Sequence, residues 1–500
     1  MGGSVRVNQI AFGVREMKPW SPHKYQIQGI RFLLEHACAA LFLDPGLGKT
    51  SITLGGIKIL HSKGIIRKTL IVAPLRVCYN VWPNEVQKWE DFSHLKVVVL
   101  HGKDKAASLK SDADIFVINP EGLDWLLDVK KEKYETRTGK VKTRFVVDEK
   151  RFAKLGFDLL VIDELSKFKN HESGRFKAMK PLLGLFQRRW GLTGSPVANG
   201  LGDLFGQCYI LDEGRSLGRY VTAFREAYFT PDRAGFVWTL KPGAEEQIYE
   251  RIAPLALRMG TELLDMPELI NNVIKVDLPP AVMATYIKFE RDLVTAFGDG
   301  LVTAGNAAAL SSKLRQIVCG GIYLDREERE DGLLDTSTKR KWENIHTAKV
   351  DALADLKDEL QGQPMLVAYD FQHDLDRLRK AFPRATYACD FPANRFSEVE
   401  RAWNEGGIDM LFGHPASIGH GLNLQEGPGH HIVWHSQTWD YDQYDQFVRR
   451  IFRQGVKSRR VFVHHLVATG TIDELVYYAI LGKKSVQDAF FKWLSERRKR

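Results

Sequence analysis

The segment Leu41–Ser51, LFLDPGLGKTS, constrains the fold of this chain more than any other. An apolar run leads into a glycine-containing turn, followed by Lys49, Thr50 and helix-compatible sequence, which is the order strand, phosphate-binding loop, helix. Gly46 and Gly48 allow backbone N–H groups to point at phosphate oxygens. Lys49 supplies a charge for the outer phosphates, Thr50 a hydroxyl for Mg²⁺, and the helix N-terminus its dipole. The segment predicts a nucleoside triphosphate site.

The match to the full phosphate-loop pattern is incomplete, because Leu43 stands where the first glycine would be. A chance glycine turn is the alternative, but a strand and a helix flank the loop as phosphate binding requires. The residues predicted to bind the nucleotide here are Pro45, Gly46, Leu47, Gly48, Lys49, Thr50 and Ser51.

Short apolar runs that end in polar turns recur in two series. The first lies between about Ser21 and Leu211 and includes Thr69–Leu75, Lys96–Gly102, Asp114–Pro120 and Phe157–Glu164. The second comprises Pro364–Asp370, Ala385–Asp390, Ile408–His414, His430–Ser436 and Arg460–Val467. Near-continuous apolar runs are typical of parallel strands that helices cover on both faces. The expected fold is therefore α/β, with two parallel-sheet lobes.

The expected domains are an N-terminal lobe over residues 1–211, a mostly helical insert over 212–344, and a C-terminal lobe over 345–500. The charged stretch Lys130–Val147 predicts a surface hairpin in the first lobe. In the middle section, Glu245–Leu257, Pro280–Phe297 and Ala307–Ile317 predict helices, and Gly235–Gly243 predicts a second hairpin. Asp325–Lys341 is typical of a loop or linker, and Lys492–Arg500 is a basic tail.

Two further segments carry residues suited to phosphate chemistry. Asp163 and Glu164 end an apolar run, where one carboxylate can hold Mg²⁺ with Thr50 and its neighbour can orient water. Ordinary acids that cap a strand are the alternative. Arg450 and Arg453 are three residues apart and should share one helix face, from which paired guanidiniums can reach a γ-phosphate. A solvated basic face is the alternative there.

Charge and composition limit the partners. The net charge of +9 favours a polyanionic partner, and lysines and arginines that are simply solvated at the surface are the alternative. No apolar run approaches the roughly 18–20 residues that span a bilayer, so we expect a soluble, intracellular protein without membrane contact. Five scattered cysteines indicate reduced thiols, and the histidines of the C-terminal strands lack zinc-ligand spacing.

Taken together and in order, these segments resemble the Swi/Snf-like family of superfamily-two DNA-dependent ATPases, especially its compact bacteriophage and prophage members. Lys24–Leu33 is similar to the opening adenine-recognition motif, with Gln26 in the glutamine position. Leu70–Trp89, Val161–Asn170 and Leu192–Phe205 resemble the next three motifs after the phosphate loop.

The later motifs complete the resemblance. Leu310–Gly321 is similar to a helix that bridges toward the second lobe, Ser417–Leu424 supplies a glycine-rich turn with Gly421, and Phe447–Gly455 places Arg450 and Arg453 on the two finger arginines. Ser166 stands in place of the usual histidine and Val456 in place of the usual glutamine.

The resemblance implies two RecA-like lobes that bind MgATP in a cleft and move along duplex DNA, mainly through phosphate contacts. Lys49, Asp163, Glu164, Arg450 and Arg453 are the implied catalytic residues. We expect a monomer that a protein partner could target. A strand-separating helicase of DNA or RNA remains an alternative, as does a nucleic-acid-binding scaffold with an inactive ATP site. The biological process is not evident from the sequence.

Overall fold

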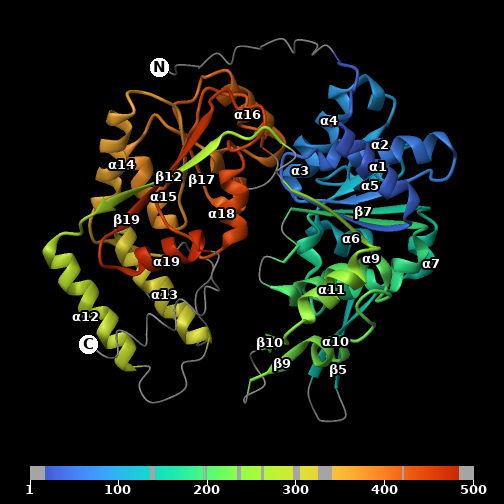
Figure 1. Ribbon diagram of the computed structural model, residues 1–500, viewed down its shortest axis with the longest axis horizontal. Coiled ribbons are helices and arrows are strands. Elements are labelled where there is room, and N and C mark those ends of the chain that lie inside the picture. The colour runs from blue at the N-terminus through green and yellow to red at the C-terminus, as the bar shows by residue number, and fades with distance from the viewer. Residues whose placement is uncertain are drawn as a thin grey trace. The chain divides into compact units, whose positions relative to one another are not determined.

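The chain forms two compact units in a computed structural model (Figure 1). The structure describes residues 17–135, 141–194, 196–197, 200–232, 238–260, 264–296, 304–324, 340–418 and 422–482. The first unit comprises the chain up to Leu43 with Gly48–Gly194 and Leu204–Arg258, and the second comprises Asp44–Leu47, Ser195–Asp203 and the chain from Met259. The predicted middle section, 212–344, is thus shared between the two units.

The first unit is built on a seven-stranded sheet in the order β11-β1-β8-β7-β2-β4-β3. Its pairs β1–β8, β8–β7, β7–β2, β2–β4 and β4–β3 are all parallel. The strands are β1 (Cys38–Leu43), β2 (Thr69–Val72), β3 (Val97–Val99), β4 (Ile115–Ile118), β7 (Leu159–Asp163), β8 (Arg188–Thr193) and β11 (Ala256–Met259).

Helices and two hairpins surround this sheet. The helices are α1 (Lys24–Glu35), α2 (Lys49–Ser62), α3 (Leu75–Asn80), α4 (Trp82–Lys88), α5 (Lys105–Ser108), α6 (Leu123–Leu126), α7 (Glu149–Ala153), α8 (Gly174–Met179), α9 (Leu204–Asp212), α10 (Val221–Tyr228) and α11 (Ala244–Ile252). The hairpins are β5 (Lys130–Glu135) with β6 (Val141–Val146), and β9 (Phe229–Pro231) with β10 (Trp238–Leu240).

The second unit contains a six-stranded parallel sheet in the order β12-β19-β18-β15-β17-β16. Its strands are β12 (Glu268–Val276), β15 (Met365–Ala368), β16 (Thr386–Tyr387), β17 (Met410–Gly413), β18 (His431–Trp434) and β19 (Arg460–Ala468). The short pair β13 (Gly321–Tyr323) and β14 (Trp342–Asn344) lies outside that sheet. The helices are α12 (Pro280–Ala296), α13 (Ala304–Cys319), α14 (Ala348–Glu359), α15 (Gln372–Ala381), α16 (Phe396–Asn404), α17 (Pro415–Ile418), α18 (Tyr441–Val448) and α19 (Ile472–Leu481).

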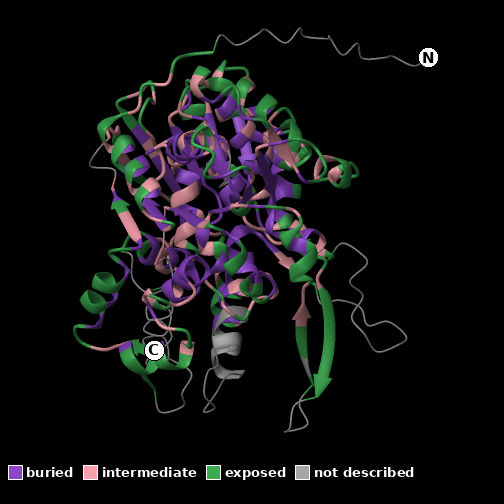
Figure 2. Ribbon diagram, turned by 90° about the vertical axis from the view of Figure 1, so that its right-hand side faces the viewer, coloured by how far each residue is buried: buried purple, intermediate pink, exposed green. Residues whose placement is uncertain are grey.

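Burial confirms the α/β fold expected from the apolar runs. Every residue of β2, β4, β15, β17 and β18 is buried, as helices on both faces require. Buried residues accordingly concentrate in the sheets, whereas the outer helices and the β5–β6 hairpin are largely exposed (Figure 2). Among the described residues, no helix is both long and apolar enough to cross a membrane.

Strand β12 was not predicted, because its sequence ELINNVIKV carries two asparagines that break the apolar pattern. Those asparagines are used in polar contacts with the neighbouring strands. The Asn272 amide lies 3.1 Å from His464 Nδ1, and His464 Nε2 lies 2.9 Å from His431 Nδ1. Burial lowers the pKa of His431 to about 3 and that of His464 to about 4, so this ladder is neutral at physiological pH.

Two other expectations need correction. The hairpin predicted at Gly235–Gly243 begins earlier, because its first strand is Phe229–Pro231. The helix predicted over Glu245–Leu257 ends at Ile252, and the apolar residues after it enter β11 at the edge of the first sheet. In both places, apolar residues that are close together in the sequence belong to different secondary-structure elements. The linker predicted at Asp325–Lys341 and the tail Lys492–Arg500 lie almost wholly outside the described residues.

Candidate nucleotide site

The loop between β1 and α2 has the backbone that phosphate binding requires. Gly46 has φ 103° and Gly48 has φ 76°, both in the left-handed region that favours glycine. Leu47 between them is fully buried. Because α2 begins at Lys49 with no acidic residue in its first turn, its N-terminal N–H groups and dipole are available to an anion.

Lys49 is held close to the loop. Its ammonium group donates a 2.6 Å hydrogen bond to the carbonyl of Leu43, the last residue of β1. Two residues further along α2, Ser51 donates a 2.6 Å hydrogen bond to the Glu85 carboxylate of α4, which also accepts from Trp89 Nε1 at 2.8 Å. Ser51 therefore braces α2 against α4, a contact for which the sequence offered no signal.

Gln26 lies directly against the phosphate loop. A Cβ atom on Gly48 would lie only 2.5 Å from Gln26 Nε2, so a side chain at position 48 would displace the amide. The Gln26 Oε1 accepts a 2.9 Å hydrogen bond from the backbone N–H of His23, which fixes the amide at the start of α1. The structure thus brings the predicted adenine-recognition residue to the loop that was predicted for phosphates.

The two carboxylates lie at the same edge of the sheet as the loop. Strands β1, β8 and β7 are adjacent and parallel, with Phe42 opposite Thr193 and Leu192 opposite Asp163. The carboxyl ends of these strands therefore meet, which is where parallel sheets place their ligands. The strands end together at this edge because each of them is a buried apolar run that stops at a polar residue or a glycine turn.

Asp163 occupies an environment that suits a cation. Burial and the neighbouring negative charge of Glu164 together raise the pKa of Asp163 to about 6, against the opposing effect of Lys49. Trp82 Nε1 donates a 3.0 Å hydrogen bond to Asp163 Oδ2 and orients the carboxylate. The role of Trp82, a fully buried residue of α4, was missed because a tryptophan in an apolar segment ordinarily indicates core packing.

Glu164 is held by two hydroxyl groups on one oxygen. Ser166 donates a 2.7 Å hydrogen bond to Glu164 Oε1, and Thr193 donates a 3.0 Å hydrogen bond to the same atom. The backbone of Glu164 is left-handed, with φ 71° and ψ 67°, which is uncommon for a residue other than glycine and is found at functional sites. The serine that replaces the usual histidine therefore bonds the predicted catalytic carboxylate itself.

These residues fit Mg²⁺ and a triphosphate. A partly desolvated carboxylate whose pKa is raised by a second carboxylate gains most from a nearby cation. Hard oxygen ligands are the ones that Mg²⁺ prefers, and Asp163 and the Thr50 hydroxyl are such ligands. Lys49 and the glycine loop supply the complementary charge and N–H donors for phosphates.

The two arginines of the second unit do not lie on one helix face as predicted. Helix α18 ends at Val448, before both residues, and Gly455 follows with φ 89°. Tertiary contacts explain the early end, because Arg450 donates a 2.9 Å hydrogen bond to the carbonyl of Leu422 while Leu424 N–H donates to the Arg450 carbonyl at 3.1 Å.

Arg453 is bound to the same loop. Its Nη1 donates a 2.5 Å hydrogen bond to Asn423 Oδ1, and its side chain is half-buried, whereas Arg450 is buried. Both arginines thus contact residues 422–424, the end of the glycine-rich turn that the sequence had singled out. Gly421 of that turn lies outside the described residues, as do Ser195, Ala198 and Asn199 of the turn after β8.

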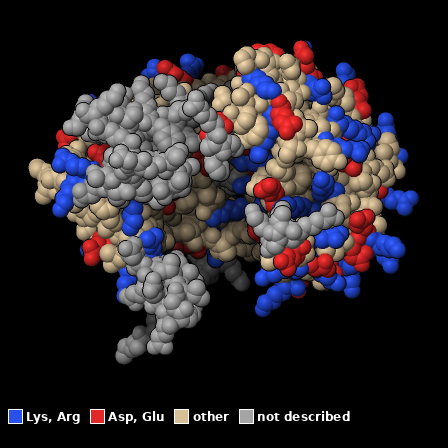
Figure 3. Space-filling model, turned by 90° about the horizontal axis from the view of Figure 1, so that it is seen from below, with Lys and Arg blue, Asp and Glu red and all other residues tan. Residues whose placement is uncertain are grey.

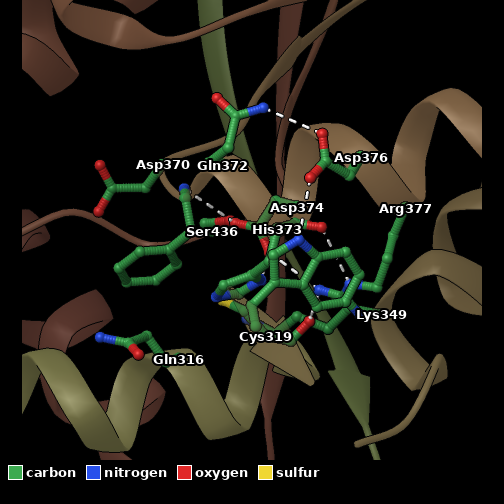
Figure 4. A network of polar contacts seen from close by, with 12 residues as sticks. Gln316, Cys319, Lys349, Asp370, Gln372, His373, Asp374, Asp376, Arg377 and Ser436 are labelled. Carbon is green, nitrogen blue, oxygen red and sulfur yellow. Dashed lines mark hydrogen bonds and ion pairs between the residues drawn. The ribbon is translucent and has the colours of Figure 1, made fainter. Parts of the chain in front are cut away.

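A buried polar network surrounds the start of α15 in the second unit (Figure 4). Asp374 accepts hydrogen bonds from Ser436 Oγ at 2.5 Å and from Arg377 Nη2 at 2.9 Å. Burial alone would raise the pKa of Asp374, but His373, His435 and Arg377 outweigh it and lower that pKa well below its usual range. Lys349 pairs with Asp473 and donates to the His435 carbonyl at 3.1 Å. The network joins α14, α15 and α19 to the turn after β18, and the carboxylates of Asp374 and Asp473 are each paired with a cation.

A parallel sheet that carries a glycine phosphate loop and two carboxylates at one edge defines a P-loop nucleoside triphosphatase. The family model described as SNF2-related domain matches residues 25–319, more than half of the chain. The chain therefore belongs to the SNF2-related family and is an ATP hydrolase, as the resemblance implied.

Individual relatives support this assignment. The chain is 35% identical over 497 residues to "Putative protein p41" of Acyrthosiphon pisum secondary endosymbiont phage 1, covering 94% of this chain and 98% of that protein. It is 23% identical to the human DNA repair and recombination protein RAD54B, covering 93% of this chain and 54% of that protein. It thus spans about half of the latter's length.

Similar solved structures include the SWI2/SNF2 ATPase core of Sulfolobus solfataricus in complex with dsDNA, at 22% identity and a TM-score of 0.42 over 95% of this chain and 94% of that one.

Proposed function

We propose that this protein couples hydrolysis of MgATP to movement along duplex DNA. The observation that carries the proposal is the set of side chains at the carboxyl edge of the first sheet. There Lys49 follows β1, and Asp163 and Glu164 lie at the end of β7, with β8 as the one strand between. Membership of the SNF2-related family supports ATP as the nucleotide. A relative named for DNA repair and recombination and a similar structure in complex with dsDNA favour DNA as the partner.

The residues of the first unit divide the chemistry among them. When bound, Mg²⁺ supplies positive charge that offsets the charge developing on the transferred phosphoryl group. Asp163 and Thr50 would hold it, and Lys49 would bind the outer phosphates. Glu164 would orient and deprotonate the attacking water through the oxygen that Ser166 and Thr193 leave unrestrained. Gln26 would bind the adenine.

Arg450 and Arg453 are proposed as the finger arginines that stabilise charge on the γ-phosphate. Their shared contacts with residues 422–424 support a common role, because movement of that loop would move both guanidiniums. Arg453, which is less buried and makes a side-chain contact, is the stronger candidate for the phosphate. Arg450, which bonds the backbone carbonyls of Gln446 and Leu422, would brace the turn.

The proposal is tested by measuring displacement of a third strand from triplex DNA during ATP hydrolysis. A duplex translocase displaces that strand in an ATP-dependent manner, whereas Lys49→Ala should not. Unwinding of forked DNA by the same preparation, without triplex displacement, would favour the helicase alternative. Absence of ATP hydrolysis under any nucleic-acid condition would favour the inactive scaffold.

A further inference from the structure

The β5–β6 hairpin is rich in positive charge. The segment Lys130–Val147 contains seven lysines and arginines but two glutamates, a net charge of +5, whereas the whole chain carries +9. More than half of the excess positive charge thus lies in one short stretch. Basic and acidic side chains are interspersed on the underside shown in Figure 3.

The hairpin extends from the unit with its side chains in solvent. All six residues of β5 are exposed, and Tyr134 and Val141 near its outer end expose 48% and 68% of their surface (Figure 2). The ladder pairs Lys130 with Val146 and Glu135 with Val141, so both strands run the full length of the projection. The exposed face of the hairpin therefore contributes little to the core, so core packing does not explain its conformation.

The base of the hairpin is fixed to the body. Phe145 of β6 packs on the start of α8 so closely that a Cβ on Gly174 would lie 2.8 Å from its ring. The Lys131 ammonium lies 5.9 Å from the centroid of the Phe145 ring and 3.1 Å from Asp124 of α6. These contacts hold the base in place, which leaves Lys130, Lys133 and Arg144 as exposed cations on an anchored ribbon.

We propose that this hairpin is a DNA-binding element that contacts the phosphate backbone of the duplex. Exposed lysines and arginines bind phosphates without reading sequence, which suits a protein that moves along DNA. The described surface of the hairpin lacks the cluster of buried aromatic anchors that characterises protein interfaces, so an acidic protein is the less suitable occupant. The inference rests on the proposed DNA-dependent function.

The first experiment removes three cations without altering the strand backbone. The triple variant K130Q/K133Q/R144Q is compared with K63Q/K380Q/R384Q, which neutralises three exposed cations elsewhere. Duplex affinity is measured over a range of salt concentrations. Each lost phosphate contact lowers the slope of log K against log salt by about 0.9, so the hairpin variant should lose about 2–3 units of slope.

Each possible outcome of this experiment supports or overturns the DNA-binding role of the hairpin. A reduced slope and at least tenfold weaker binding near 100 mM salt for the hairpin variant alone, with DNA-independent ATP hydrolysis unchanged, would support the inference. Equal slopes for the hairpin variant and its control, when the wild type binds duplex DNA, would overturn the hairpin role and leave the proposed function intact. Failure of the wild type to bind DNA would overturn both.

A second experiment reports contact directly and does not depend on changed affinity. A photo-crosslinking amino acid at Tyr134 should attach to bound duplex DNA. The same replacement at Tyr220, which is 72% exposed and lies outside the hairpin, serves as the control. Equal crosslinking at both positions, or none at Tyr134 in a DNA-bound complex, would refute the assignment.

Discussion

Removal of the two hydroxyls that hold Glu164 should slow ATP hydrolysis without weakening ATP binding. Ser166 and Thr193 both donate to Glu164 Oε1, at 2.7 and 3.0 Å. The variants Ser166→Ala and Thr193→Val delete one donor each, and the double variant deletes both. Either remaining donor still restrains the carboxylate, so the two losses should not be additive.

The magnitude follows from the strength of these bonds. A hydrogen bond to a charged group contributes about 1.5–3 kcal/mol, and about 1.4 kcal/mol corresponds to a tenfold change in rate. Each single variant should lower kcat by about 3- to 10-fold, because one donor remains. The double variant, which frees a carboxylate in a strained backbone conformation, should lose about 2–3 kcal/mol, or about 30- to 200-fold in kcat.

The assay is steady-state ATP hydrolysis with saturating duplex DNA, with kcat and the KM for ATP measured separately. The KM should stay near the wild-type value, because the hydroxyls act on Glu164, the carboxylate proposed to orient the attacking water. Ser166→Thr keeps a hydroxyl and should retain most of the activity. A double variant with wild-type kcat, or a loss that appears in KM or follows a fall in Tm, would refute the reasoning.

Two other predictions concern charges. Because the pKa of Asp163 is raised to about 6, its carboxyl binds a proton as the pH falls through that value. The Mg²⁺ concentration needed for half-maximal hydrolysis should therefore rise. If this concentration, titrated at fixed ATP, stays constant between pH 7.5 and 5.5, Asp163 is not a ligand. Lys349→Ala leaves Asp473 buried without its partner and should cost about 3–5 kcal/mol of unfolding free energy, whereas exposed Lys357→Ala on the same helix should change it by less than about 0.5 kcal/mol. Equal unfolding midpoints in urea for these two variants would contradict the second prediction.

Prediction from sequence succeeded where one local pattern determines the structure. The buried strands were identifiable because parallel strands covered on both faces are apolar throughout. The turn between β1 and α2 and the place of Asp163 at the end of β7 were predictable, because an apolar run stops at each of them. Strand β12 was missed since its asparagines, which read as loop residues, bond histidines of a strand nearly two hundred positions away.

The site details that were missed depend on long-range contacts. Ser166 stands in place of the usual histidine, and its hydroxyl reaches Glu164 two residues earlier, where the Glu164 backbone is left-handed. Trp82 reaches Asp163 across the sheet edge from a separate helix. The helix expected at Arg450 ends early because the Arg450 side chain bonds the loop after α17. A local periodicity in the sequence does not reveal such long-range contacts.

The rate of ATP hydrolysis with and without duplex DNA, in the wild type and in Lys49→Ala, tests the central claim most directly. A motor whose loop and carboxylates form one phosphate site should hydrolyse ATP faster when duplex DNA is present. Lys49→Ala should abolish that turnover and spare most of the DNA affinity. Undiminished hydrolysis in Lys49→Ala, or a wild-type rate indifferent to DNA, would contradict the claim.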